Sequence, residues 1–143
     1  MTTNKIRVVI DPNIIASVLL GGITQKRYLW LLDNLKYFDI CYSDKILEEI
    51  RHFPEVNYFK KKGITTEIIE AFLSSFQAYS LKIIVSSKVK LGRDANDYFL
   101  LSLCRDAKAK FLTTGDPDLL ELEKYASTRI LSMKDFVEVF QKS

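Results

Sequence analysis

Two aspartates in this sequence occupy equivalent places, each directly before a proline and a stretch with helical spacing. Asp11 follows the apolar run Ile6–Ile10, and Asp116 follows the apolar stretch that begins at Phe111. The plainest interpretation is that each carboxylate caps a helix, because proline suits the first helical position. An ionised group at the end of a buried strand is nevertheless costly without a partner, and ligands of parallel sheets gather at such ends. The repeated pattern therefore also indicates a binding site.

A glutamate in the middle of the chain can join this site. Ser43 is a good N-cap for a helix whose apolar positions define one face. Glu48 falls nearly opposite the centre of that face and is expected to be solvated. Glu49 falls at the edge of the face, where its side chain can reach over the rim of a sheet. Glu49 is therefore the better candidate.

Three more aspartates have suitable positions. Asp97 falls in the first turn of a helix predicted over 95–105, on the face shared with apolar residues three and four positions later. Asp94 lies on the same side and can cap that helix, so a capping box is the competing interpretation for the pair. Asp118 comes within reach if Asp116 belongs to the site.

Four of these acids, Asp11, Glu49, Asp97 and Asp116, come from four separate segments that the predicted topology can bring together. Two carboxylates about 4 Å apart repel by roughly 4 kcal/mol at an effective dielectric constant of 20. Four cannot all stay charged in one pocket without a cation or protons. Oxygen donors without histidine or cysteine favour Mg²⁺ or Mn²⁺ over Zn²⁺, and such ions act mainly on phosphate esters.

The elements that must position these acids alternate along the chain. Short apolar runs are separated by amphipathic stretches, the pattern of a parallel sheet covered on both faces. We expect a single domain over 1–143, an α/β fold built as a three-layer α/β/α sandwich around a central, mainly parallel five-stranded sheet. The strands are predicted over 6–10, 38–42, 82–86, 111–114 and 129–131. The stretch 54–66, PEVNYFKKKGITT, is predicted as a loop.

Composition narrows the class of protein. The 21 basic and 18 acidic residues give a formal charge of +3, which permits a nucleic-acid partner without requiring one. No apolar run is long enough to span a membrane, and a cytoplasmic protein is expected. Cys41 and Cys104 are expected to be buried free thiols. His52, the single histidine, has no nucleophile or acid partner and is interpreted as a surface residue.

Four blocks of the sequence together resemble the PIN domain, in order and over nearly the whole chain: VVIDPNIIASVLLGG, YSDKILEEIRHF, RDANDYFLLSLC and FLTTGDPDLLEL. The likeness is greatest to the small prokaryotic PIN proteins described as toxins of toxin–antitoxin systems. It implies Mg²⁺- or Mn²⁺-dependent hydrolysis of RNA phosphodiesters, with an antitoxin protein as a partner and a homodimer as the assembly. The implied metal site consists of Asp11, Glu49, Asp94, Asp97, Asp116 and Asp118, supported by Asn13 and Thr114.

One departure from the family pattern leaves alternatives open. The family usually has a small hydroxyl residue where this chain has Pro12, although Ser17 or Thr114 can supply another hydroxyl. A PIN-like module that binds RNA or metal with weak or no turnover is therefore the second hypothesis. A small-molecule phosphatase or a phosphorelay receiver is the third, although the sequence after the first strand reads D-x-N where the phosphatase pattern has D-x-D.

The sequence signals for surfaces that contact partners are less specific than those for the acidic site. Lysines in the stretches 60–62 and 88–93, with Lys108 and Lys110, can lie along an RNA path, although a solvated charged face is the more common explanation of such runs. The aromatic residues have the spacing of a core. An exposed subset of Tyr28, Trp30 and Leu31 is the candidate groove for a second copy or an antitoxin.

Overall fold

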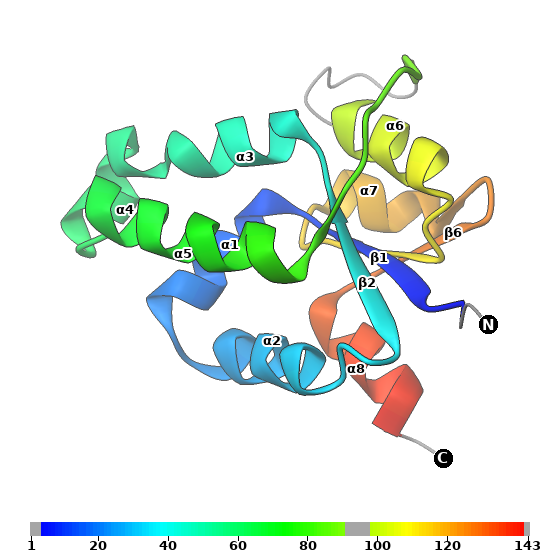
Figure 1. The fold of residues 1–143 in the computed structure, drawn as a ribbon, viewed down its shortest axis with the longest axis horizontal. Coiled ribbons are helices and arrows are strands. Elements are labelled where there is room, and N and C mark those ends of the chain that lie inside the picture. Colours follow the sequence, from blue (N-terminus) through cyan, green and yellow to red (C-terminus); the bar gives the residue numbers. More distant parts are fainter. Residues whose placement is uncertain (1–3, 91–97, 142–143) are drawn as a thin grey trace.

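The computed structural model describes residues 4–90 and 98–141, which fold around one six-stranded sheet (Figure 1). The strands are β1 (Ile6–Ile10), β2 (Phe38–Tyr42), β3 (Leu81–Lys82), β4 (Phe111–Thr113), β5 (Lys124–Tyr125) and β6 (Thr128–Leu131). The helices are α1 (Pro12–Leu20), α2 (Ile23–Asp33), α3 (Asp44–Arg51), α4 (Asn57–Lys61), α5 (Thr66–Tyr79), α6 (Tyr98–Ala107), α7 (Pro117–Leu122) and α8 (Met133–Gln141). A short 3₁₀ helix spans Phe53–Glu55.

The sheet places β1 and β4 side by side at its centre. The strand order is β3-β2-β1-β4-β6-β5, and every neighbouring pair is parallel except β5 with β6. The chain therefore builds the sheet outward from β1 in one direction and then returns to extend it from β4 in the other. In open parallel sheets this switch point is where ligands bind, beyond the carboxyl ends of the strands.

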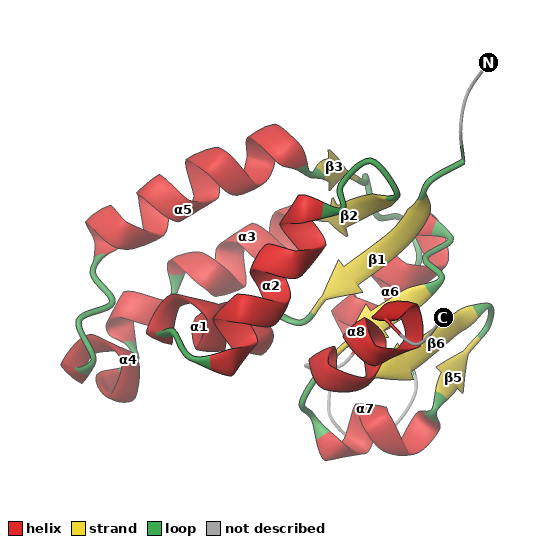
Figure 2. Cartoon of the chain, turned by 90° about the horizontal axis from the view of Figure 1, so that it is seen from below, coloured by secondary structure: helices red, strands yellow, loops and turns green. Residues whose placement is uncertain are grey.

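Helices cover both faces of the sheet, as the three-layer prediction requires. Helices α2 and α8 pack together on one face, and α6 lies on the other (Figures 1 and 2). Beneath α8, the rings of Phe38 and Phe111 lie edge-on to that of Phe136, with centroids 5.6 and 5.3 Å away. Trp30 joins this cluster at 6.3 Å from Phe136, so its aromatic ring belongs to the packing between α2 and α8.

The prediction of a mainly parallel α/β sandwich is confirmed, and the sheet has one strand more than expected. The additional strand, β5, forms a hairpin with β6 whose turn holds Ala126 at a φ of 52°. Two residues are too few to give an apolar pattern, so the sequence does not reveal them. The third strand is also displaced, because β3 ends at Lys82 and the following residues continue without strand pairing.

Local capping signals predicted several helix starts correctly. Ser43 accepts a hydrogen bond from the Ile46 N–H, and Thr65 accepts one from the Ile68 N–H. Ser132 likewise accepts from the Asp135 N–H. The predicted helix start at Asp94 lies outside the described residues.

The loop predicted over 54–66 is wrong, because α4 forms within it. The rings of Phe53 and Phe59 pack with centroids 5.2 Å apart, and Ile64 is buried. These apolar contacts order a segment whose lysines suggested a solvated loop. In the described part of the chain, none of the helices combines the length and the apolar character needed to cross a bilayer.

The predicted exposed subset of α2 is also wrong in part. Tyr28 and Leu31 are buried, and the Tyr28 hydroxyl is hydrogen-bonded to that of Tyr79 on α5. Trp30 is half-buried, while Leu29 between them is 50 % exposed. Buried and exposed side chains alternate because only one side of α2 packs against the rest of the protein. The sequence alone did not reveal which side that is.

Candidate functional site

Asp11 lies at the carboxyl end of β1 and is almost completely buried. One carboxylate oxygen, Oδ1, accepts a hydrogen bond of 2.9 Å from the Asn13 N–H at the start of α1. Pro12 occupies the first helical position, where no N–H is needed. The capping interpretation is therefore correct, but this cap uses one oxygen only. Asp11 differs from an ordinary surface cap in two respects. It is buried, and its second carboxylate oxygen, Oδ2, is not used for the cap.

The second oxygen of Asp11 faces β4, because β1 and β4 are paired in register. Ile10 pairs with Thr113, and the Asp11 N–H donates to the Thr113 carbonyl at 3.0 Å. Thr114 directly follows the last residue of β4, and its Oγ1 donates to Asp11 Oδ2 at 2.7 Å. Thr114 is fully buried, so this hydroxyl is held in one place.

Hydrogen bonds continue from Thr114 to the second Asp-Pro element. Thr114 Oγ1 accepts from the Asp116 N–H at 3.1 Å, and Asp116 Oδ1 accepts from the Asp118 N–H at 2.9 Å as the cap of α7. The sequence placed Asp116 at a helix start, and this position is correct. The ends of β1 and β4 thus form one connected polar network.

Electrostatics tie three predicted acids to one neighbourhood. Burial raises the pKa of Asp11 above its ordinary value of 3.8, and the negative charges of Asp116 and Glu49 raise it further. The hydrogen bonds from Asn13 and Thr114 act in the opposite direction and lower that pKa. A carboxylate that is buried and flanked by like charges is most easily kept ionised by a nearby cation.

Glu49 approaches from α3, which packs against α1. Its side chain is half-buried, whereas 71 % of the Glu48 side chain is exposed and pairs with Lys45 at 3.3 Å. The helical-wheel separation of these two glutamates is thus correct. Asp118 is exposed and contributes its N–H to the network.

Two predicted site residues, Asp94 and Asp97, lie outside the described residues. Among the residues that are described, no three side chains of histidine, cysteine, aspartate or glutamate are close enough to hold a metal ion by themselves. Asp11, Asp116 and Glu49 still offer only oxygen donors, which suit a hard divalent cation such as Mg²⁺ or Mn²⁺. The complete ligand set therefore remains a prediction.

A hollow of about 310 Å³ adjoins the network on the side of α1, lined by Asn13, Ile14, Ser17, Gly115 and Asp116. The exposed side chain of Asn13 lies at this hollow. Ser17 donates to the Asn13 carbonyl at 3.4 Å and does not touch Asp11. Of the two hydroxyls suggested to replace the one missing at Pro12, Thr114 is therefore the one that contacts the buried acid.

Other reactive side chains lie away from this site. Cys41 and Cys104 are buried free thiols, and burial raises the pKa of each to about 12, so both stay protonated at neutral pH. His52 is on the surface and lies 2.5 Å from Glu55. These observations confirm that the thiols are buried and that the histidine is a surface residue.

The fold and the acidic network define an α/β protein with a polar site at the switch point of its sheet. The sequence pattern of the PIN domain matches residues 7–118, and the chain belongs to this family. The family decides against the phosphatase and receiver alternatives. A comparison with curated protein sequences gave no match.

Among solved structures, a similar chain occurs in VapBC2 from Rickettsia felis, crystallised with a DNA fragment from its promoter. The two chains share 17 % identity with a TM-score of 0.58, and the alignment covers 87 % of this chain and 97 % of the other. This likeness shows that the two chains share a fold.

Proposed function

We propose that this protein is a divalent-metal-dependent ribonuclease that hydrolyses RNA phosphodiesters. The observation that carries the proposal is the burial of Asp11 beside the charges of Asp116 and Glu49, which raises the pKa of Asp11 at the switch point of a PIN fold. Burial and nearby like charges both disfavour the ionised form of Asp11, and a bound cation would offset this cost.

Asp11, Glu49 and Asp116 would offer oxygen donors to the ion, together with Asp94, Asp97 and Asp118. Because no three of the described acids could hold an ion by themselves, the site would need a further ligand, for which Asp97 is the first candidate. When bound, Mg²⁺ or Mn²⁺ offsets the carboxylate charges and polarises a phosphodiester. The protein's own part is to fix the donors. Thr114 and the Asn13 N–H hold the two oxygens of Asp11, so the carboxylate keeps its orientation before substrate arrives.

The biological role proposed is that of a toxin. Membership of the PIN family and a fold shared with a chain of VapBC2 support this assignment. Its partners would be an antitoxin protein and a second copy of the chain, and its RNA substrate would be met in the cytoplasm.

The test is cleavage of a 5′-labelled single-stranded RNA with Mg²⁺, with Mn²⁺, and with EDTA. Glu49→Gln is expected to lower the rate about 10- to 100-fold, the usual effect of weakening a metal site. Glu48→Gln is the matched control, because it removes a neighbouring charge that is exposed and forms a surface pair of little energetic value. Equal rates for the two variants would reject the role of Glu49.

Asp97→Asn extends the test to the candidate that lies outside the described residues, and it should abolish cleavage while leaving thermal unfolding cooperative. Undiminished cleavage by this variant, in a preparation free of contaminating nuclease, would argue against the proposed ligand set.

Pro12 favours a second candidate function, a metal- or RNA-binding module with little turnover. It is buried at the first turn of α1 and offers no hydroxyl where the family pattern usually has one. The two candidates differ in one outcome. Both predict that Mn²⁺ raises the melting temperature, since a ligand of the native state stabilises it. The binding module leaves the RNA intact.

A further inference from the structure

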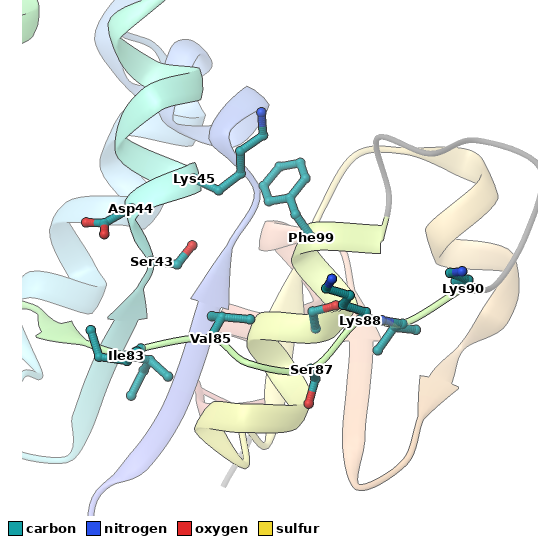
Figure 3. A pocket seen from close by; sticks show the side chains of 12 residues that line it. Ser43, Asp44, Lys45, Ile83, Val85, Ser87, Lys88, Lys90 and Phe99 are labelled. Atoms are coloured by element: carbon teal, nitrogen blue, oxygen red, sulfur yellow. Dashed lines mark hydrogen bonds between the residues drawn. The ribbon is translucent and has the colours of Figure 1, made fainter.

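A pocket of about 510 Å³ opens between the start of α3, the segment 83–90 and the first turn of α6 (Figure 3). Its apolar lining includes Ile83, Val85 and Val89. Phe99 projects from α6 toward Lys45 on α3. Lys45, Lys88 and Lys90 supply the positive charges. We refer to this space as the Phe99 pocket; its volume suits a small organic group such as a nucleoside.

The Phe99 pocket lies at the same edge of the sheet as the acidic site. Helix α3 follows the carboxyl end of β2, and the segment 83–90 follows β3, and both strands run parallel to β1. Lys45 of the pocket and Glu49 of the acidic neighbourhood stand four positions apart on α3. Side chains at that spacing are neighbours, with Cβ atoms about 5–6 Å apart. A ligand long enough to span one turn of α3 would therefore contact both Glu49 and the pocket.

The charges around the pocket favour an anion. Among the described lining residues the one acid, Asp44, is paired with Lys82 at 3.1 Å, and Lys45 is paired with Glu48 at 3.3 Å. The other charged lining residues, Lys88 and Lys90, are both positive. Phe99 is only half-buried, so its ring contributes to the pocket as well as to the core. Proteins that bind single-stranded nucleic acids commonly combine an aromatic ring with nearby cations. A base stacks on the ring, and the phosphate backbone contacts the cations.

The pocket wall is held in place by α6. Asp106 accepts hydrogen bonds from the Ser86 and Ser87 N–H groups at 2.6 and 2.9 Å. The buried Ser102 Oγ accepts from the Val89 N–H at 3.0 Å. These contacts fix a segment that has no strand partners along most of its length, so the lining is preorganised for a ligand.

We propose that the Phe99 pocket is a nucleotide subsite, in which one base of a single-stranded RNA stacks on Phe99 and the adjoining phosphates contact Lys45 and Lys88. The proposal rests on the ribonuclease function above and adds where the substrate strand runs. The strand passes from the ends of β1 and β4 toward the ends of β2 and β3. Binding of a base in this pocket would let the protein prefer single-stranded RNA with an exposed base, which the acidic site, in contact only with phosphate, cannot do.

The test is the affinity for 5′-fluorescein-labelled octa-adenylate RNA, measured by fluorescence anisotropy in EDTA so that no cleavage occurs. Phe99→Leu keeps an apolar side chain and removes the ring, and it should weaken binding about tenfold, the loss of one stacked base. Phe99→Tyr retains the ring and should bind like the parent protein. Both variants are first checked for an unchanged circular-dichroism spectrum.

An abasic octamer of the same charge separates stacking from a general structural effect. The difference between Phe99→Leu and the parent should disappear with this probe, because no base is present to stack. If the difference persists, or if Phe99→Leu binds octa-adenylate as well as the parent does, the subsite is overturned. Loss of octa-glutamate binding in Phe99→Leu, with RNA binding unchanged, would assign the pocket to an acidic protein segment instead and would equally overturn it.

Salt dependence tests the lysines. Lys88→Gln should reduce the slope of the logarithm of the binding constant against the logarithm of salt concentration by about 0.7, the value for one phosphate of a single strand. Lys124→Gln, on the strand β5 at the far edge of the sheet, should leave the slope unchanged. An unchanged slope for Lys88→Gln would contradict its phosphate contact.

These results are independent of the cleavage assay. Ring-dependent binding without cleavage would overturn the ribonuclease and support the subsite. Cleavage with binding that does not depend on Phe99 would overturn the subsite alone.

Discussion

Replacing Thr114 with valine tests whether the hydroxyl beyond β4 organises the acidic site. Valine has nearly the same shape, so Thr114→Val removes two hydrogen bonds without opening a large cavity. One is the 2.7 Å bond donated to Asp11, and the other is the 3.1 Å bond accepted from the Asp116 N–H. A bond to a charged group contributes about 1.5–3 kcal/mol and a neutral one about 0.5–1.5 kcal/mol. The free energy of unfolding should therefore fall by about 2–4.5 kcal/mol at pH 8.

The assay is urea unfolding followed by circular dichroism in EDTA, where a changed midpoint with an unchanged slope reports stability. Thr114→Ser is the matched control, because it keeps the hydroxyl and loses one buried methyl group, at a cost of about 0.5–1.5 kcal/mol. The excess cost of valine over serine should shrink as the pH falls through the raised pKa of Asp11, since a protonated carboxyl accepts a weaker bond. If valine costs no more than serine at pH 8, Thr114 does not organise the site.

Three further predictions concern the same acids and the core. Because the folded-state pKa of Asp11 is raised above 3.8, the folded protein binds more protons than the unfolded chain in the pH range just above 3.8. The free energy of unfolding should therefore fall as the pH rises through that range. Urea unfolding of Asp11→Asn in EDTA should lack this part of the pH dependence. Asp116→Asn removes a like charge and should lower the pKa of Asp11, which carbon-detected NMR titration of the carboxyl group measures directly; an unchanged pKa would mean that the two acids do not interact. Phe136→Ala, at a fully buried ring between α8 and the sheet, should lower the free energy of unfolding by about 3–5 kcal/mol in the same urea assay, and a cost below 1 kcal/mol would contradict the packing described.

The features that the sequence predicted well are those encoded in adjacent residues. The strand-Asp-Pro-helix pattern placed Asp11 and Asp116 at strand ends, and the wheel of α3 separated Glu49 from Glu48. Alternation of short apolar runs with amphipathic stretches predicted the layered α/β fold. In each case a few neighbouring side chains determine the outcome, so a local pattern suffices.

The remaining features depend on contacts between distant segments. The bond from Thr114 to Asp11 requires β4 to pair with β1, and strand order is not written in any local pattern. The two-residue strand β5 forms only because it lies beside β6. The Phe99 pocket likewise needs three segments to meet. The sequence placed Lys88 and Lys90 in a run that can follow an RNA path, but no local pattern brought Lys45 or Phe99 to them.

Because Thr114 lies 103 residues after Asp11, the candidate centre is a product of the finished fold and of no smaller part. A growing chain on the ribosome carries Asp11 and Glu49 long before it can offer them Thr114 and Asp116. Pairing such remote strands is among the slower events of folding. If the protein is the ribonuclease proposed above, incomplete copies that end before β4 lack Thr114 and Asp116, and cleavage of RNA begins only after synthesis has passed both halves of the sheet.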